Sequence, residues 1–234
     1  GCALPLCRAV PPRDLALPRG AGAPAGGPTI LVHAEQGLGD TIQFLRYLPL
    51  SRQPGSAARV ILECPPDLVR LFAHGARGQV EITARASREA AVTTPGDLHL
   101  PLLSLPWVLK QFEPRQMSAP YLEVDDTWRV AWRERLGASL VLRVGLAWTG
   151  NRKHQNARRS LVFETLAPLL RVPGVSFCSL QIEPRAPANA ALVDFTEHIT
   201  DFADTAALMC ELDLIITVDT AAAHLAGALG RPVW

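Results

Sequence analysis

The stretch Thr29-Ile-Leu-Val-His-Ala-Glu-Gln-Gly-Leu-Gly-Asp40 decides the fold of the chain. Its apolar residues at 30–32 are typical of a buried strand, and a glycine-containing turn follows at 33–40. Beyond the turn, Ile42, Leu45 and Leu48 recur three residues apart and predict a helix with one apolar face. Asp40 is a suitable N-cap for that helix. The stretch therefore predicts one strand–turn–helix unit of an α/β sheet.

The same alternation of strand and helix recurs along the rest of the chain. Further strands are expected at residues 59–63, 80–82, 98–100, 144–148, 175–180 and 214–218. Helices are expected after Pro65-Pro66, from Thr127 to Leu136, between Leu161 and Leu170, from a cap at Asp204 to Leu212, and from Asp219-Thr220 to Gly230. Alternation at this spacing predicts an α/β fold with parallel sheets.

The pattern divides the chain into three parts. Residues 1–28 are rich in Pro, Gly, Ala and Arg without a period, which predicts a linker or tail. Residues 29–125 and 126–234 form two α/β domains, joined through a mixed stretch that ends in an acidic pair. The chain does not begin with Met, and its last residues, 231–234, are typical of the start of a strand. We therefore expect a piece of a longer protein whose second domain is incomplete.

Composition excludes several classes of protein. Hydrophobic residues make up 48% and charged residues 19% of the 234 residues, and the net charge of +1 favours neither nucleic acid nor an anionic membrane as the main partner. No apolar stretch reaches the roughly 20 residues of a membrane span, and no signal-peptide pattern opens the chain. Five scattered cysteines without a C-x-x-C pair favour buried, reduced thiols. We expect a cytoplasmic protein.

The first candidate site is the acceptor-side loop Gln36-Gly-Leu-Gly39 with Asp40. Its glycines allow close approach of a ligand, and the following helix presents free N–H groups that attract anions. An ordinary strand–helix turn with an aspartate cap would look the same. A dinucleotide site is the other alternative, because Glu63 stands where a ribose-binding acid would lie. That fingerprint requires a third glycine, and Ile42 occupies its position.

Two further candidates follow predicted strand ends in the second domain. In Asp219-Thr-Ala-Ala-Ala-His224, small side chains at the start of a helix leave room for a diphosphate that His224 could contact. The loop at 149–159 concentrates four cations, and two of these are Arg158 and Arg159. Such a loop could clamp phosphate. A capped helix and a solvated charged loop are the simpler alternatives.

Four segments, 33–47, 144–151, 201–208 and 218–230, resemble the glycosyltransferase module of bacterial tetratricopeptide-repeat proteins. That module is similar to glycosyltransferase family 9, the lipopolysaccharide heptosyltransferases. The resemblance spans residues 29–234 and implies a GT-B-like fold, two Rossmann-like domains facing a cleft. It also implies that the family's C-terminal part, which follows the strand beginning at Pro232, is missing from this chain. That loss puts the activity of the isolated chain in question.

The resemblance implies a role for each matched residue. Asp40 corresponds to the general base that takes the proton of the acceptor hydroxyl. Asp219 corresponds to the residue that binds donor sugar hydroxyls, and Thr220, Ala221, Ala222 and His224 correspond to the diphosphate cradle. Arg158 or Arg159 would stabilise the leaving nucleoside diphosphate. By analogy the reaction is inverting and uses no metal or cofactor, and the sequence contains no D-x-D triplet.

The leading hypothesis is therefore transfer of a sugar from a nucleotide-diphosphate donor to a glycan, lipid-linked or protein acceptor. The first alternative is a non-catalytic module that binds nucleotide or glycan within a repeat-containing scaffold. The second is a dinucleotide-dependent oxidoreductase, which Ile42 disfavours. Fold alone does not choose the donor or the acceptor.

Overall fold

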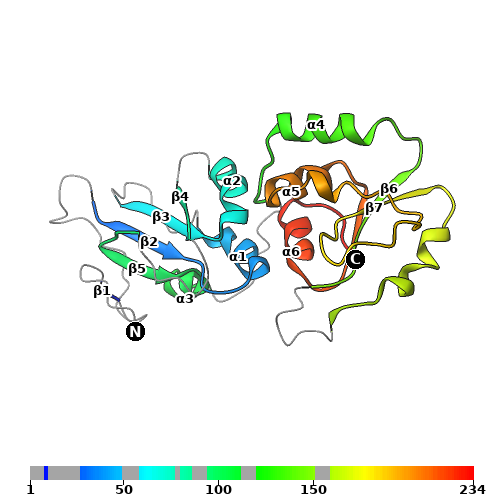
Figure 1. Cartoon of the computed structure of the whole chain (residues 1–234). Coiled ribbons are helices and arrows are strands. Elements are labelled where there is room, and N and C mark those ends of the chain that lie inside the picture. Colours follow the sequence, from blue (N-terminus) through cyan, green and yellow to red (C-terminus); the bar gives the residue numbers. More distant parts are fainter. Residues whose placement is uncertain are drawn as a thin grey trace. The chain divides into compact units, whose positions relative to one another are not determined.

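The computed structural model describes residues 8–9, 27–48, 58–76, 80–85, 94–111, 120–150 and 159–234 (Figure 1). The chain divides into two compact units, Gly1–Ser118 (unit 1) and Ala119–Trp234 (unit 2). Each unit contains one sheet, and all named strand pairs in both sheets are parallel. The predicted α/β fold with parallel sheets is confirmed.

Unit 1 is built on a five-stranded sheet with the order β1-β5-β2-β3-β4. Its strands are β1 (Arg8–Ala9), β2 (Thr29–His33), β3 (Arg59–Cys64), β4 (Glu81–Ala84) and β5 (Leu98–Pro101). The apolar run predicted at residues 30–32 is the buried centre of β2, which pairs with β3 on one side and β5 on the other. A strand buried on both faces favours a continuous apolar run over alternation.

The helices of unit 1 follow the strand ends. They are α1 (Leu38–Phe44), the 3-10 turn η1 (Leu45–Tyr47), α2 (Pro66–Gly75), the 3-10 turn η3 (Leu102–Ser104) and α3 (Leu105–Val108). The predicted proline start of α2 is confirmed, and Leu68, Leu71 and Phe72 are buried along it. Asp40 is not the N-cap of α1. Gly37 holds that position, and Asp40 lies in the first turn, where its carboxylate accepts the Gly37 amide.

Unit 2 has a three-stranded sheet of order β7-β6-β8. Its elements are α4 (Asp126–Leu136), β6 (Leu142–Ala147), β7 (Val175–Ser179), α5 (Phe202–Cys210), β8 (Leu214–Thr217) and α6 (Ala221–Ala228). Val144, Leu146, Trp148 and Phe177 form a buried cluster on this sheet. Val233 makes a parallel bridge to Ile215 on β8, which confirms the predicted strand-like character of residues 231–234.

Two further local predictions were wrong. The helix expected between Leu161 and Leu170 is two 3-10 turns, η5 (Phe163–Leu166) and η6 (Leu169–Arg171), because Pro168 has no N–H to continue an α-helical ladder. Asp201, not Asp204, caps α5; its carboxylate accepts the amides of Ala203 and Asp204. Residues 8–9 of the stretch predicted as a linker or tail form β1, which pairs with β5.

Two expectations from composition can be compared with the structure. Cys64 and Cys178 are buried free thiols, as predicted; burial raises the pKa of Cys64 to about 12 and that of Cys178 to about 11. Cys2 and Cys7 lie outside the described residues. Within the described ranges, no helix combines the length and the apolar character needed to cross a bilayer.

Gly145 in the middle of β6 gives a test of the packing in unit 2. A Cβ there would lie 2.7 Å from Cδ1 of both Leu180 and Leu212, so we expect Gly145→Ala to cost about 1–3 kcal/mol of unfolding free energy. Gly227 in α6 meets no atom within 4 Å, and Gly227→Ala should stabilise by about 0.5–1 kcal/mol. Urea unfolding followed by circular dichroism measures both; equal effects would contradict the packing described.

Candidate functional site

Unit 2 brings the carboxyl ends of β6 and β8 together. Ala147 lies opposite Thr217 in the parallel pair, and the amide of Val218 donates to the carbonyl of Ala147 over 3.1 Å. The loops that leave the two strands therefore start side by side. A Cβ built on Gly150 would lie only 3.4 Å from Cγ2 of Thr220, so the loops also pack closely. Ligands of open parallel sheets bind at this edge.

The start of α6, which the sequence predicts as a phosphate cradle, is a capped helix start. Thr220 is the N-cap, and its hydroxyl accepts the amide of Ala222 over 3.3 Å. That amide is therefore already occupied, whereas those of Thr220 and Ala221 have no acceptor among the described residues. His224 lies half-buried in the first turn of the same helix. The helix start thus leaves the amides of Thr220 and Ala221 available, next to alanines that add no bulk.

The predicted basic residue and the predicted sugar-binding acid contact each other. Arg159 Nη1 lies 2.5 Å from Oδ2 of Asp219, and both side chains are about half exposed, at 46% and 64%. The two residues are 60 positions apart, and the parallel pairing of β6 with β8 brings their loops together. Arg158, the other candidate, lies outside the described residues.

Hydrogen bonds hold the backbone beside Arg159, and the sequence analysis did not predict them. The Ser160 hydroxyl accepts from the Thr149 hydroxyl over 2.8 Å and from the Gly150 amide over 3.3 Å. The Leu161 amide donates to the carbonyl of Trp148 over 2.8 Å. Ser160 and Leu161 are therefore fastened to Trp148, which directly follows β6, and to the two residues after it.

Gln181 is a second residue that sequence reasoning missed. It is 7% exposed, and its Oε1 accepts the amides of Trp148 and Thr149 at 3.1 and 3.0 Å. Its Nε2 donates to the carbonyl of Glu183 over 2.5 Å. A buried amide with all its partners fixes the loop after β6 against the loop after β7. A buried glutamine just past an apolar strand is the only local signal for this role.

The glycine loop of unit 1 leads from β2 into α1. Gln36 is exposed, and Gly37, Leu38 and Gly39 are half-buried. The Gly37 amide donates to Oδ2 of Asp40 over 3.2 Å, so the Asp40 carboxylate is held at the start of the helix. It remains half-buried there, within reach of a ligand at the carboxyl edge of the sheet.

Glu35 is an acid beside this loop that the sequence did not single out. Its carboxylate accepts the amides of Leu102 and Leu103, at 3.0 and 3.1 Å, at the start of η3. Burial raises the pKa of Glu35, the two amides oppose the rise, and the charge of Asp40 adds to it. Glu35 thereby ties the glycine loop to the segment that follows β5, and places a second carboxyl group close to Asp40.

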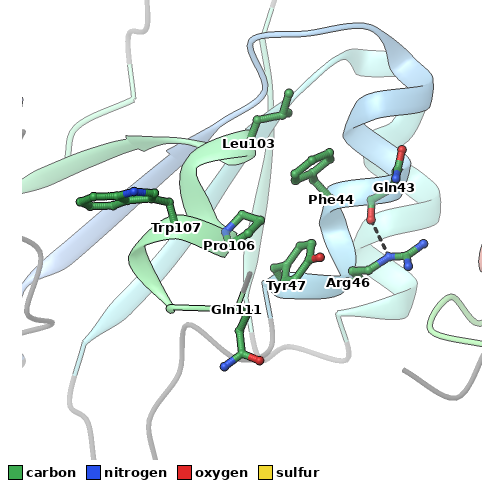
Figure 2. A pocket seen from close by; sticks show the side chains of 8 residues that line it. All are labelled: Gln43, Phe44, Arg46, Tyr47, Leu103, Pro106, Trp107 and Gln111. Carbon is green, nitrogen blue, oxygen red and sulfur yellow. Dashed lines mark hydrogen bonds between the residues drawn. The ribbon is translucent and has the colours of Figure 1, made fainter. Parts of the chain in front are cut away.

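A cavity of about 410 Å³ opens between α1–η1 and η3–α3 (Figure 2). In Figure 2 the rings of Phe44 and Tyr47 face Leu103 and Pro106 across it. Gln43 and Phe44 lie three and four residues after Asp40 on α1, so they share its helix face. The other lining residues are Arg46, Trp107 and Gln111. The wall combines aromatic and aliphatic surface with two amides, a phenol and one guanidinium.

A buried polar cluster at the ends of β2 and β3 argues against the dinucleotide alternative. Glu63 is 1% exposed; the Thr94 hydroxyl donates to its Oε2 over 2.5 Å, and Arg85 Nε lies 3.6 Å from Oε1. A ribose-binding acid must be open to its ligand, whereas this carboxylate is enclosed. The ring of the neighbouring His33 is tilted against that of His99, and their centroids are 5.9 Å apart. The pKa of His33 is lowered to about 4, mainly by burial and to a smaller extent by the charges of Arg85 and His99.

Comparison with known proteins gives one family match. Residues 198–234, which include α5, β8 and α6, match the model of glycosyltransferase family 9 (heptosyltransferase). Among curated proteins, the chain is 28% identical to Protein FlbA of Caulobacter vibrioides over 92% of its own length. It spans only 40% of the length of that relative.

Solved structures of low sequence identity share the fold. The E. coli ADP-heptose lipopolysaccharide heptosyltransferase II aligns with 88% of this chain and 83% of its own, at a TM-score of 0.59 and 14% identity. A family 9 glycosyltransferase of Veillonella parvula aligns with 88% of this chain and 80% of its own, at a TM-score of 0.57 and 14% identity. The dodecameric, iron-containing heptosyltransferase TibC, solved with ADP-D-β-D-heptose, aligns with 87% of this chain and 57% of its own, at a TM-score of 0.55 and 13% identity. The predicted GT-B-like heptosyltransferase fold is confirmed; the link to tetratricopeptide repeats stays a prediction.

The pKa of His33 makes a prediction about acid stability. In the unfolded chain the pKa of His33 has its ordinary value of 6.5, and in the folded chain it is about 4. The unfolded state therefore binds the proton first as pH falls, and the free energy of unfolding decreases through this pH range. We expect His33→Gln to lose less unfolding free energy than the wild type between pH 7 and pH 4, measured by urea unfolding. His74→Gln, outside the cluster, should behave as the wild type. Identical losses in His33→Gln and wild type would contradict the prediction.

Proposed function

We propose that the protein is a glycosyltransferase of the family 9 type, which moves a sugar from a nucleotide-diphosphate donor to an acceptor hydroxyl. The observation that carries this proposal is the family match over 198–234, because it spans β8, α6 and the turn between them, which together contain Asp219, Thr220 and His224. The shared heptosyltransferase fold supports the proposal independently. Inversion at the anomeric carbon and independence from metal are part of it.

Unit 2 would hold the donor. The diphosphate meets the amides of Thr220 and Ala221 at the positive end of α6, and His224 donates to it. Ala221 and Ala222 leave space for the phosphates, and Arg159 supplies the cation that stabilises the leaving group. Asp219 accepts hydrogen bonds from the sugar hydroxyls. TibC was solved with an ADP-linked heptose, which makes a nucleotide sugar a reasonable class of donor here.

Unit 1 would supply the base. Asp40 takes the proton of the acceptor hydroxyl as that oxygen forms a bond to the anomeric carbon. The bond from the anomeric carbon to the phosphate oxygen breaks, and its electron pair leaves with the nucleoside diphosphate. The Gly37 amide orients the Asp40 carboxylate. General base catalysis of this kind is worth about 10²–10⁴ in rate.

The acceptor would lie along the same face of α1. The cavity next to Gln43 and Phe44 is within the size range of small-ligand sites, and its wall offers rings for packing and amides for hydrogen bonds. We place in this cavity the part of the acceptor that adjoins the reacting hydroxyl. Binding there would bring the hydroxyl to the first turn of α1, where Asp40 stands.

The first test is nucleotide binding. Calorimetry with ADP, UDP, GDP, CDP and NAD should show saturable binding of a nucleoside diphosphate and none of NAD. An Arg159→Ala, His224→Ala double variant should bind it at least tenfold more weakly, because two groups that contact the phosphates are lost. Glu164→Gln, an exposed acid elsewhere in unit 2, is the control. Binding of NAD alone, or of nothing, would remove the proposal.

The second test separates base from acceptor contacts. With labelled nucleotide sugar and an extract of the source organism as acceptor, Asp40→Asn should lower kcat by about 10²–10⁴ and leave nucleotide binding intact. The asparagine oxygen can still accept the Gly37 amide, so the loop is kept. Trp107→Ala should instead raise the KM for acceptor with little change in kcat. Transfer by Asp40→Asn at the wild-type rate would rule out the base, and absence of transfer by the wild type would favour a binding module.

A further inference from the structure

We propose that Asp219, through its pairing with Arg159, makes the unit 2 site discriminate between the intact nucleotide sugar and the nucleoside diphosphate that remains after transfer. This inference rests on the proposed function and deepens it. It assigns to Asp219 a role in releasing the product as well as in holding the sugar.

The ion pair involves the residue that directly precedes the start of α6. Asp219 directly precedes Thr220, the N-cap of α6, so its backbone adjoins the helix start that the proposed function assigns to the phosphates. Arg159 contacts that carboxylate at 2.5 Å, and among the described residues neither side chain has another ion pair. With no ligand bound, Asp219 therefore holds the cation that the diphosphate requires.

Hydrogen bonds fix the backbone on both sides of the Arg159–Asp219 pair. Ser160, next to Arg159, is fastened to Thr149 and Gly150, and the Val218 amide is bonded to Ala147 on the neighbouring strand. The two backbones are thus fixed to the same edge of the sheet. The side chains are about half exposed and can exchange partners without movement of the backbone. Arg159 can therefore turn from Asp219 to a phosphate and back again.

The charge of the ligand changes during the proposed reaction. In a nucleotide sugar the terminal phosphate is a diester with one negative charge, and the sugar hydroxyls can donate to Asp219. After the bond to the anomeric carbon breaks, that phosphate is a terminal group with a second ionisation near pH 6, and it gains almost a full charge at pH 7. The hydroxyl donors have left with the sugar. Asp219 then repels the product and competes with it for Arg159.

The expected behaviour differs from that of a residue that only binds the ligand. Removing the charge of Asp219 should tighten the binding of free nucleoside diphosphate about three- to fivefold, the range of a partly exposed ion pair. The same change should weaken binding of the nucleotide sugar at least threefold, because its hydroxyls lose a charged acceptor. Removing the guanidinium of Arg159 should weaken both ligands.

The experiment compares the dissociation constants of paired probes by calorimetry: ADP with ADP-glucose, UDP with UDP-glucose, and GDP with GDP-mannose. Asp219→Asn keeps the size of the side chain at an exposed position, Arg159→Gln is the second variant, and Glu164→Gln is the matched charge control. Opposite changes for the two members of a pair in Asp219→Asn, with parallel losses in Arg159→Gln, would support the inference.

Weaker binding of both probes, or equal changes in both, in Asp219→Asn would overturn the inference and leave the proposed function standing. If the wild type binds none of the six probes, the proposed function fails, and the inference fails with it. The two failures are therefore distinguishable in one set of titrations.

Discussion

Parallel strand pairing is the constraint on which the candidate sites depend. Parallel strands end at the same edge of a sheet, so the loops after β6 and β8 meet even though their sequences lie far apart. The contact of Arg159 with Asp219 and the packing of Gly150 against Thr220 both follow from that pairing. In unit 1 the same rule puts the loop after β2 beside the segment after β5, where Glu35 accepts two amides of η3.

Buried polar groups make these edges rigid. Gln181 in unit 2 and Glu63 in unit 1 are both enclosed, and each is engaged by backbone or side-chain donors at the end of a strand. Leaving such a group without a partner costs about 1–3 kcal/mol, so these bonds hold the loops in one arrangement. The half-exposed side chains, Asp40, Arg159 and Asp219, stand on this fixed support. A site with rigid backbones and exchangeable side-chain pairs suits a ligand whose charge changes during reaction.

The two units divide the proposed chemistry. Unit 1 combines a carboxylate held at the start of α1 with an aromatic cavity along the same helix face, which suits an acceptor and its base. Unit 2 combines a helix start lined by alanine with a cation and an acid, which suits a diphosphate linked to a sugar. The constellation of unit 1 does not suit a dinucleotide, because Glu63 is enclosed and Ile42 stands in place of the third glycine.

The sequence by itself determined the elements: the apolar runs of β2, β3 and β8, the proline start of α2, and the small-residue start of α6 could all be predicted because they reflect local periodicity and local backbone restriction. It also singled out Asp40, Asp219 and Arg159. Helix starts were misplaced at Asp40 and Asp204, since a first-turn acid and an N-cap acid look alike in one sequence. Only the tertiary structure decided which groups meet. Arg159 contacts Asp219, 60 positions away, and Glu35 contacts Leu102, 67 positions away. The order of the strands in the sheets sets such contacts, and the spacing of residues along the chain does not reveal that order.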